Sequence, residues 1–322
     1  MTDRTPLVSV IIPTYNRPDR LVQSLESVAD QTYETLEIIV VDDASEMPAE
    51  EAVASLRDRI PYDLAVYRHG ENRGANAARN TGLREASGEF VAFLDDDDEW
   101  STSKVARQVE AFQGASADTG LVYTSIRIVD EDGMVIRTTD ASVEGVMTKQ
   151  LLCKNTIGSF SCVMVRFAAV DDAGLLDETF PSWQDLDWYI RISENWRIQA
   201  ITDPLVTNHT GGYERITSDT AALIQKTYPR FIAKHRPRAA AYGRLFERKM
   251  LGWAAFRVGA WYVLPAGQNE IAQQYIKCAI ALYPFEPRFY IYGAIALGGE
   301  PTNVCFHWVK NIYERMIQIY KD

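Results

Sequence analysis

Four consecutive aspartates, Asp95–Asp98, are the part of this sequence best suited to chemistry. They follow the apolar run 90–94 directly and are closed by Trp100 after one further acid. Adjacent carboxylates repel one another, so this cluster is costly unless cations bind it or water solvates it. If alternate side chains project the same way, Asp95 and Asp97 can converge on one divalent cation, and Mg²⁺ typically takes one or two carboxylates together with substrate phosphates. The plain alternative is a solvated acidic loop.

Other polar residues with chemical potential come later in the chain. Asp185 and Asp187 begin a segment with helical spacing, and His209 follows a short strand-like run. An acid at the start of a helix can serve only as a cap or as a first-turn partner of the helix dipole. A lone histidine is usually structural. The acids of the segment 130–133 predict a hairpin turn rather than a metal site, because turns favour Asp and Gly for backbone reasons.

The elements that must position these residues alternate between strand and helix. Short β-branched apolar runs predict buried strands, and the segments between them have helical spacing. In order, the predicted elements are strand 7–14, helix 18–29, strand 36–41, helix 49–59, strand 64–68, helix 74–86, strand 90–94 and helix 101–112. This alternation predicts an α/β fold with a right-handed, mostly parallel sheet and helices on both of its faces.

Three polar clusters lie where predicted strands end. They are the segments 13–16, 42–43 and 95–98. In sheets of this kind, ligands bind beyond the carboxyl ends of the strands. The pattern therefore predicts a ligand site at this edge of the sheet.

Over about residues 7–215 the sequence resembles family 2 of the glycosyltransferases. The resemblance rests on four segments in the family's order, VSVIIPTYNR, VVDDAS, NRGANAARNTGLREASGEFVAFLDDDD and QDLDWYIR. It implies the GT-A fold, which is Rossmann-like. It also implies an enzyme that uses a nucleotide-activated sugar and inverts the anomeric carbon.

The resemblance implies roles for residues on the nucleotide side. The turn at Pro13 and Tyr15 would hold the base, with Tyr15 stacking on it, and Asp42 would accept a hydrogen bond from the base. Arg79 would contact uracil or the diphosphate, since arginine suits bidentate phosphate contacts. A surface salt bridge is the alternative for Arg79.

Asp95 and Asp97 resemble the DxD motif of the family, whose acids bind the ribose and a metal ion. Mg²⁺ or Mn²⁺ is therefore the implied cofactor. Many enzymes of this fold place a late histidine on the metal, and His209 matches that order. The implied metal ligands are Asp95, Asp97 and His209, with Asp95 also on the nucleotide.

The segment QDLDW resembles the acidic motif of the family at a helix start. The family usually has Glu-Asp there, whereas this chain has Gln184-Asp185. The second position is the catalytic base, which implies Asp185, or Asp187 if the register differs by two. The base would take a proton from the acceptor hydroxyl during a single in-line displacement of a nucleoside diphosphate.

The predicted function is that of an inverting, metal-dependent glycosyltransferase in surface polysaccharide or glycoprotein glycan assembly. A UDP-sugar is the favoured donor by resemblance, and the acceptor would be a glycan or a polyprenyl-linked molecule. One alternative is a catalytically silent nucleotide-sugar-binding or scaffold protein of the same fold. A nucleotidyltransferase is disfavoured because the loop after the first strand, 15–18, contains no glycine.

The amino-acid composition limits the classes of protein to which this chain can belong. The 322 residues are 47% hydrophobic and carry a formal net charge of −11, which argues for a folded core and against general nucleic-acid binding. Four scattered cysteines indicate a reducing compartment. The amino terminus does not resemble a signal peptide, and no apolar stretch reaches the roughly 18 residues of a membrane span. We therefore expect a cytoplasmic location, with the inner face of the cell membrane as one place of action.

The carboxyl-terminal part differs in charge and texture. We expect the catalytic domain to span 1–220 and a helical region to span 221–322. Residues 226–257 hold nine basic side chains against one acidic, and aromatic residues are frequent downstream. Solvated helix faces are one interpretation; a peripheral membrane contact through 226–262 is the other. Ala272, Ile276, Ala279 and Pro284 match part of a tetratricopeptide unit, which predicts a packed helical hairpin or a partner site.

Overall fold

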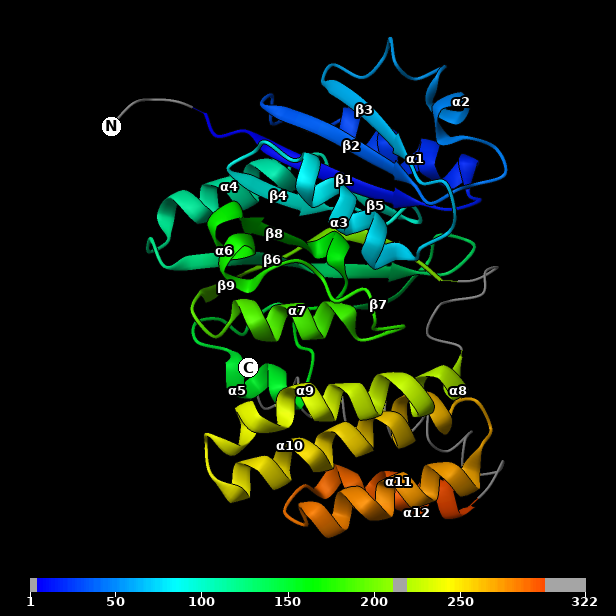
Figure 1. The fold of residues 1–322 in the computed structure, drawn as a ribbon, viewed down its shortest axis with the longest axis vertical. Helices are drawn as coiled ribbons and strands as arrows, with labels where there is room; N and C mark the ends of the chain where they lie inside the picture. The colour runs from blue at the N-terminus through cyan, green and yellow to red at the C-terminus, as the bar shows by residue number, and fades with distance from the viewer. Residues whose placement is uncertain (1–4, 211–218, 299–322) are drawn as a thin grey trace. The chain divides into compact units, whose positions relative to one another are not determined.

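The computed structural model describes residues 5–210 and 219–298, and its chain divides into two compact units (Figure 1). The larger unit comprises Met1–Leu151, Asn155–Thr179 and Trp183–Tyr213. The smaller unit comprises Glu214–Asp322 together with two short excursions of the earlier chain, Leu152–Lys154 and Phe180–Ser182.

A mixed nine-stranded sheet forms the larger unit. Its order is β3-β2-β1-β4-β8-β6-β9-β5, and β7 pairs with β6. The strands are β1 Val8–Thr14, β2 Leu36–Asp42, β3 Asp63–Arg68, β4 Phe90–Phe93, β5 Asp98–Trp100, β6 Thr119–Val129, β7 Val135–Thr138, β8 Val163–Arg166 and β9 Arg197–His209. The first four strands in chain order pair in parallel with one another, whereas β8 is antiparallel to both β4 and β6. The predicted α/β fold with its mostly parallel sheet is confirmed.

Helices follow the strands in the predicted order. They are α1 Pro18–Ala29, α2 Ala49–Val53, α3 Ala75–Glu85, α4 Lys104–Gly114, α5 Thr148–Cys153, α6 Phe167–Ala173 and α7 Gln184–Ile192, with the 3-10 turn η1 Phe160–Cys162. The α3 helix packs on β1 and β2, and a Cβ at Gly82 would lie 2.4 Å from Ile11. Glycine is thus what lets this helix approach the sheet so closely.

One helix is shorter than expected, and one predicted hairpin is present. The helix predicted over 49–59 ends at Val53 and continues as turns. The predicted hairpin at 130–133 forms as expected between β6 and β7. The Asp130 carboxylate accepts the N–H groups of Asp132 and Met134, and Gly133 has φ +77°, so backbone geometry accounts for these residue types.

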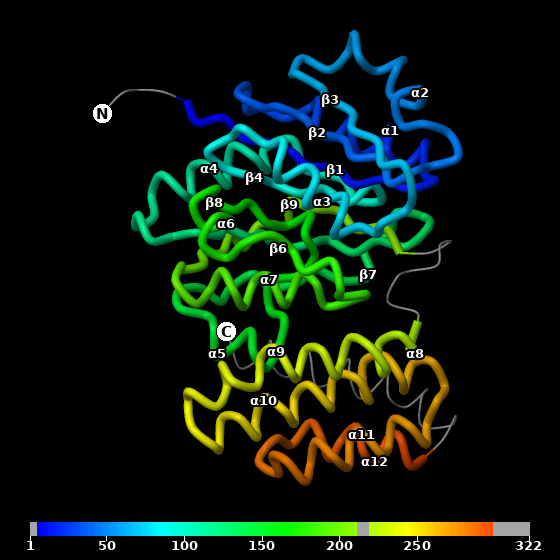
Figure 2. The backbone as a smooth tube through the Cα atoms, viewed as in Figure 1, coloured from blue at the N-terminus to red at the C-terminus, as the bar shows by residue number. Residues whose placement is uncertain are grey.

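The smaller unit is helical over its described residues. Its elements are α8 Thr220–Ala222, η3 Leu223–Thr227, α9 Tyr228–Ala240, α10 Arg244–Phe256, η4 Arg257–Val263, α11 Asn269–Leu282 and α12 Pro287–Gly298. Figure 2 traces the two successive hairpins, α9 with α10 and α11 with α12, which pack together through α10 and α11. Ala272, Ile276 and Ala279 form the buried stripe of α11. Helix packing alone explains their burial, and the tetratricopeptide assignment stays a prediction.

Within residues 5–210 and 219–298, none of the helices is both long and apolar enough to cross a membrane.

Candidate functional site

The polar ends of three neighbouring strands meet at one edge of the sheet. Strand β1 lies between β2 and β4, and its register places Thr14 opposite Asp42. On the other side, the Leu94 N–H donates to the Ile11 carbonyl, so the acidic run begins beside the end of β1. The Thr14 hydroxyl then donates to Asp96 at 2.8 Å. The three clusters that the sequence places at strand ends therefore lie together.

The acidic run turns instead of extending β4. The Asp98 N–H donates to the Asp95 carbonyl at 3.0 Å, and the chain then enters β5. The alternation of side chains that would point Asp95 and Asp97 the same way is therefore interrupted. Asp95 pairs with Arg79 at 2.5 Å, whereas Asp97 pairs with Arg17 at 3.1 Å.

The two remaining aspartates of the run are buried. Asp96 accepts hydrogen bonds from Thr14 and Arg17, and burial raises its pKa to about 6 although the Arg17 charge opposes that change. Burial also raises the pKa of Asp98 well above its usual range, helped by the charges of its acidic neighbours, while the Asn208 amide donates to it at 2.7 Å. These two side chains help fix the shape of the turn, and the more exposed carboxylates of the run are those of Asp95 and Asp97.

Arg79 is a buried cation with unused hydrogen-bond donors. It lies on α3 with 5% of its surface exposed, and its guanidinium stacks over the Phe160 ring at 4.3 Å. Only one nitrogen, Nη2, reaches Asp95; the buried Nε and Nη1 have no partner. Leaving buried donors unpaired is unfavourable, and such a guanidinium suits bidentate binding of an anion. Arg79 is therefore not a surface salt bridge.

Asp185 lies in the first turn of α7 and is held by a side chain from elsewhere in the sequence. The Asn155 amide nitrogen donates to its Oδ2 at 2.8 Å. The Asn155 oxygen meanwhile accepts the N–H groups of Ile157 and Gly158, which fixes the amide in its own loop. Trp183 caps the helix in the left-handed region with φ +61°, so Asp185 is not the N-cap. The carboxylate is half-buried and oriented.

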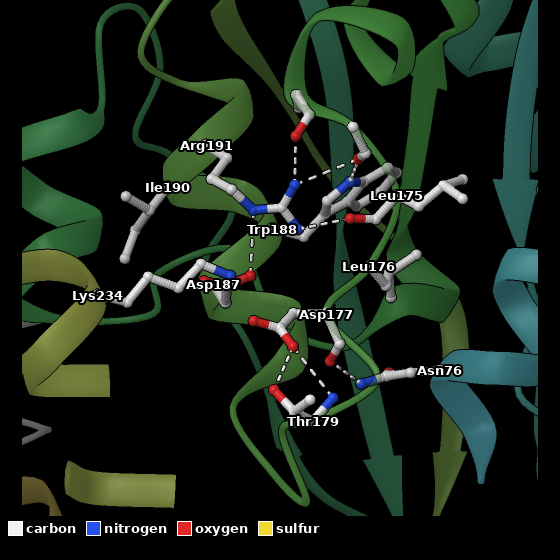
Figure 3. A network of polar contacts seen from close by, with 12 residues as sticks. Asn76, Leu175, Leu176, Asp177, Thr179, Asp187, Trp188, Ile190, Arg191 and Lys234 are labelled. Carbon is white, nitrogen blue, oxygen red and sulfur yellow. Dashed lines mark hydrogen bonds and ion pairs between the residues drawn. The ribbon is translucent and has the colours of Figure 1, made fainter. Parts of the chain in front are cut away.

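Asp187, two residues later, is buried in the protein core. It is fully buried and pairs with Arg191 one helical turn later at 3.1 Å. Figure 3 shows that the same guanidinium also donates to backbone carbonyls of the segment 173–175. The Asp187–Arg191 pair therefore holds α7 against the loop that precedes it.

The residues implied for the nucleotide base occupy different environments. Tyr15 is 44% exposed directly after β1, whereas Pro13 is buried within that strand. Asp42 is fully buried, and its two carboxylate oxygens accept the N–H groups of Ser45 and Ala49 at 2.8 and 3.0 Å. These bonds shape the loop after β2, and a contact between Asp42 and a base stays a prediction.

The residues implied for a metal have suitable donor atoms. Asp95 and Asp97 offer carboxylate oxygens, the hard ligands that Mg²⁺ and Mn²⁺ prefer. His209 ends β9, and its Nε2 lies 3.0 Å from Glu99 Oε1. The described part of the chain contains no cluster of three or more His, Cys, Asp or Glu side chains gathered for metal binding. Two carboxylates fit an ion whose other ligands come from a diphosphate and water, which is how Mg²⁺ is commonly held.

Three residues that carry no assignment from the sequence also build this site. Arg17 neutralises Asp97, Asn155 orients Asp185, and the Ser161 hydroxyl accepts the Asp95 N–H at 3.0 Å. Arg17 stands inside one of the four matched segments, so that segment was a usable signal. Asn155 lies 30 residues from its partner, and nothing in the sequence pattern indicates the contact.

Comparison with curated proteins gives relatives that are glycosyltransferases. The chain is 34% identical over 165 residues to a putative teichuronic acid biosynthesis glycosyltransferase, TuaG, of Bacillus subtilis, a match that spans 51% of this chain and 64% of that protein. It is 31% identical over 197 residues to an uncharacterized glycosyltransferase of Rickettsia bellii, which spans 58% of this chain and 27% of the relative. This chain therefore spans less than two thirds of the length of these relatives.

Solved structures give the same fold. One is S. aureus TarS 1-349 in complex with UDP-GlcNAc, with a TM-score of 0.63, 20% identity, and coverage of 86% of this chain and 84% of that one. Another is the mannosyltransferase PcManGT from Pyrobaculum calidifontis in complex with GDP-Man and Mn²⁺, with a TM-score of 0.56, 21% identity, and coverage of 96% and 89%. At this identity they establish the GT-A fold and nothing finer.

A family model described as glycosyl transferase family 2 matches residues 9–174. This region contains β1 to β4, the acidic turn, Arg79 and Asn155, and ends before α7. Because the match spans more than half of the chain and agrees with the fold, the chain belongs to glycosyl transferase family 2.

Proposed function

We propose that this chain is an inverting glycosyltransferase that moves a sugar from a nucleoside-diphosphate sugar to a glycan or lipid-linked acceptor. The observation that carries the proposal is the buried Arg79 guanidinium, which has two unpaired nitrogens beside Asp95 at the end of β4. A diphosphate is the anion that this arrangement suits, and family membership supplies the reaction class. Surface polysaccharide or glycoprotein glycan assembly is the proposed setting, and the teichuronic acid relative supports it.

On the donor side, Arg79 contacts the diphosphate and Asp95 the ribose. Tyr15 is exposed at the strand end, where it can stack on a base, directly after the segment that contains Pro13. Asp42, which accepts the Ser45 N–H in the loop after β2, is the proposed acceptor of a hydrogen bond from the base. We favour UDP as the nucleotide. The complexes of fold neighbours with UDP-GlcNAc and with GDP-Man leave both nucleotides open to test.

Mg²⁺ or Mn²⁺ is the proposed cofactor, held by Asp95 and Asp97 with His209 as a third ligand. When bound, the ion neutralises charge on the leaving diphosphate. Arg17 contacts the Asp97 carboxylate in this structure, so ion binding requires that Arg17 share or release Asp97.

On the acceptor side, Asp185 is the proposed general base. It takes the proton of the acceptor hydroxyl as the oxygen attacks the anomeric carbon from the face opposite the diphosphate. The Asp185 carboxylate is half-buried and held in one orientation, which suits this task. Asp187 instead forms a buried ion pair with Arg191.

We further propose that the chain acts at the cytoplasmic face of a membrane. The catalytic part would be 1–220, and the helical region 221–322 would make the peripheral contact through its basic stretch 226–262. A lipid-linked acceptor requires such an approach, and basic side chains are attracted to anionic headgroups.

Calorimetric titration of UDP and of GDP tests the donor site. With Mn²⁺ present, one nucleotide should bind, and EDTA or Asp97→Ala should weaken that binding by about tenfold or more, because charge-assisted contacts of the phosphates are lost. Asp203→Ala removes a surface carboxylate of similar exposure and serves as the matched control. Absence of binding by either nucleotide in folded protein with metal would refute the proposal.

A catalytically silent nucleotide-sugar-binding protein is the second candidate. It shares the donor site, and only turnover separates the two. Nucleotide binding without release of UDP or GDP from any sugar donor, in the presence of membrane extracts as an acceptor source, would favour it. The retention of Asp95, Asp97 and Asp185 favours the enzyme.

Asn155→Asp should lower kcat by about tenfold to a hundredfold. This is the rate change that corresponds to the free energy of one hydrogen bond to a charged group, about 1.5–3 kcal/mol. The variant keeps an oxygen for the loop N–H groups of Ile157 and Gly158 but loses the donor to Asp185. Nucleotide affinity and the donor KM should stay unchanged. The control is Asn195→Ala, at an exposed position just after the end of α7. An equal loss of nucleotide affinity would mean that Asn155 supports only the fold.

A further inference from the structure

One end of the helical unit consists of two adjacent turns. The turn between α9 and α10 lies beside the turn between α11 and α12, at the left end of the unit in Figure 2. Arg248 joins them, because its guanidinium donates to the carbonyls of Ala281 and Leu282 at 2.9 Å. Lys249 adds a contact 5.8 Å above the Tyr283 ring. The two turns therefore form one continuous surface.

Apolar side chains project from both turns into solvent. Tyr242 is 43%, Leu245 62% and Phe285 70% exposed. The same unit buries Trp253, which is 3% exposed, and Phe289, which is fully buried, although Tyr290 on α12 is 48% exposed. Tyr242 and Phe285 each contact a neighbouring ring, Phe246 and Tyr283 respectively, but much of their surface stays in water. This exposed apolar surface has a cost in solvation free energy that a partner could recover.

Basic side chains surround these three residues. Residues 236–249 and 283–288 contain six basic and two acidic side chains, a net charge of +4. Both acids already have arginine partners: Glu247 pairs with Arg236 at 2.6 Å and Glu286 with Arg288 at 2.5 Å. The surface therefore presents positive charge without a competing negative patch, in a chain whose net charge is −11.

We propose that this end of the helical unit, defined by Tyr242, Arg244, Leu245 and Phe285, docks on an anionic phospholipid bilayer. Aromatic and aliphatic tips enter the headgroup region while the arginines meet lipid phosphates, the arrangement that interfacial binding uses. The inference rests on the proposed function only for its purpose, which is access to a lipid-linked acceptor. The proposed membrane contact is thereby limited to the turn 242–245 within the basic stretch 226–262, together with Phe285, which lies outside that stretch.

Co-sedimentation of the whole chain with vesicles tests the proposal without any substrate. Vesicles of equal parts phosphatidylglycerol and phosphatidylcholine should bind the protein, and pure phosphatidylcholine should bind it far less. Arg244→Glu changes the charge by two and should weaken binding about thirtyfold, since each basic residue contributes about one kcal/mol of attraction. The combined Leu245→Ser and Phe285→Ser variant should also lose binding. High salt should weaken the binding of the parent protein more than that of Arg244→Glu, because salt screens the attraction that the variant has already lost.

Matched controls keep the test specific. Leu297→Ser removes a side chain that is 67% exposed at the far end of α12, and Arg59→Glu reverses an exposed charge in the larger unit; neither should change vesicle binding. Equal losses in the controls would overturn the proposal. A concentration-dependent dimer that Phe285→Ser abolishes would also overturn it and assign the surface to a second copy. Nucleotide titration of the same variants should be unchanged, which separates failure of this inference from failure of the proposed function.

Discussion

Replacement of Asp185 by Asn is expected to lower the rate of sugar transfer by about a hundredfold to ten-thousandfold, the usual contribution of a general base. The amide has nearly the same shape but cannot accept the acceptor's proton. Because Asp185 lies on α7, whereas Arg79 and Asp95 of the proposed donor site lie on α3 and after β4, nucleotide binding should not change.

The measurement is steady-state transfer from a radiolabelled nucleotide sugar, combined with UDP or GDP titration of the same preparation. A folded Asp185→Asn protein that also loses nucleotide binding would contradict the assignment. An acceptor that carries an ionised phosphate needs almost no base. A small effect with a phosphate acceptor and a large effect with a hydroxyl acceptor would therefore identify the attacking group.

Arg191→Met is expected to destabilise the protein by about 3–5 kcal/mol, the cost of leaving one member of a buried ion pair without its partner. Methionine fills similar space, but the buried Asp187 carboxylate loses the Arg191 charge 3.1 Å away. The carbonyls of Ala173 and Leu175 lose their Arg191 donor as well, whereas the Gly174 carbonyl keeps the Trp188 indole N–H. The loss should appear as a lower midpoint of urea unfolding.

Arg107→Met is the matched control, because Arg107 forms a 2.6 Å pair with Asp203 in which both side chains are nearly half exposed. Surface pairs contribute at most about 1 kcal/mol, so this variant should unfold almost like the parent. Below its unfolding midpoint, Arg191→Met should still transfer sugar. If Asp187→Asn abolished transfer while leaving stability intact, the base would be Asp187 and the proposed role of Asp185 would be wrong.

The order of the elements could be predicted because each has a local signal. The continuous β-branched run of β1 indicates a strand covered on both faces, and Pro18 in the first turn marks the start of α1. The acidic run lacked such a signal. Whether it extends β4 or turns depends on partners far away in the sequence, among them Thr14, Arg17 and Asn208, and those contacts decide it.

Some residues of the candidate site could be identified from the sequence, and others could not. Arg79 and Asp95 belong to matched segments, and the structure brings them within 2.5 Å. Asn155 could not be found, because its role depends on a loop whose geometry brings it to Asp185 across 30 residues. Asp187 has the same residue type and nearly the same position as Asp185, and only its burial separates the two.

The short segment 155–161 has a consequence for how such an enzyme could change its substrate. Asn155 at its start holds Asp185, and Ser161 at its end holds the backbone of Asp95 and accepts the Trp100 indole N–H. One segment of the chain therefore contacts both Asp95, on the proposed leaving-group side, and Asp185, the proposed base. Insertions or deletions there would tune the enzyme to a longer or shorter sugar while the nucleotide site stayed as it is.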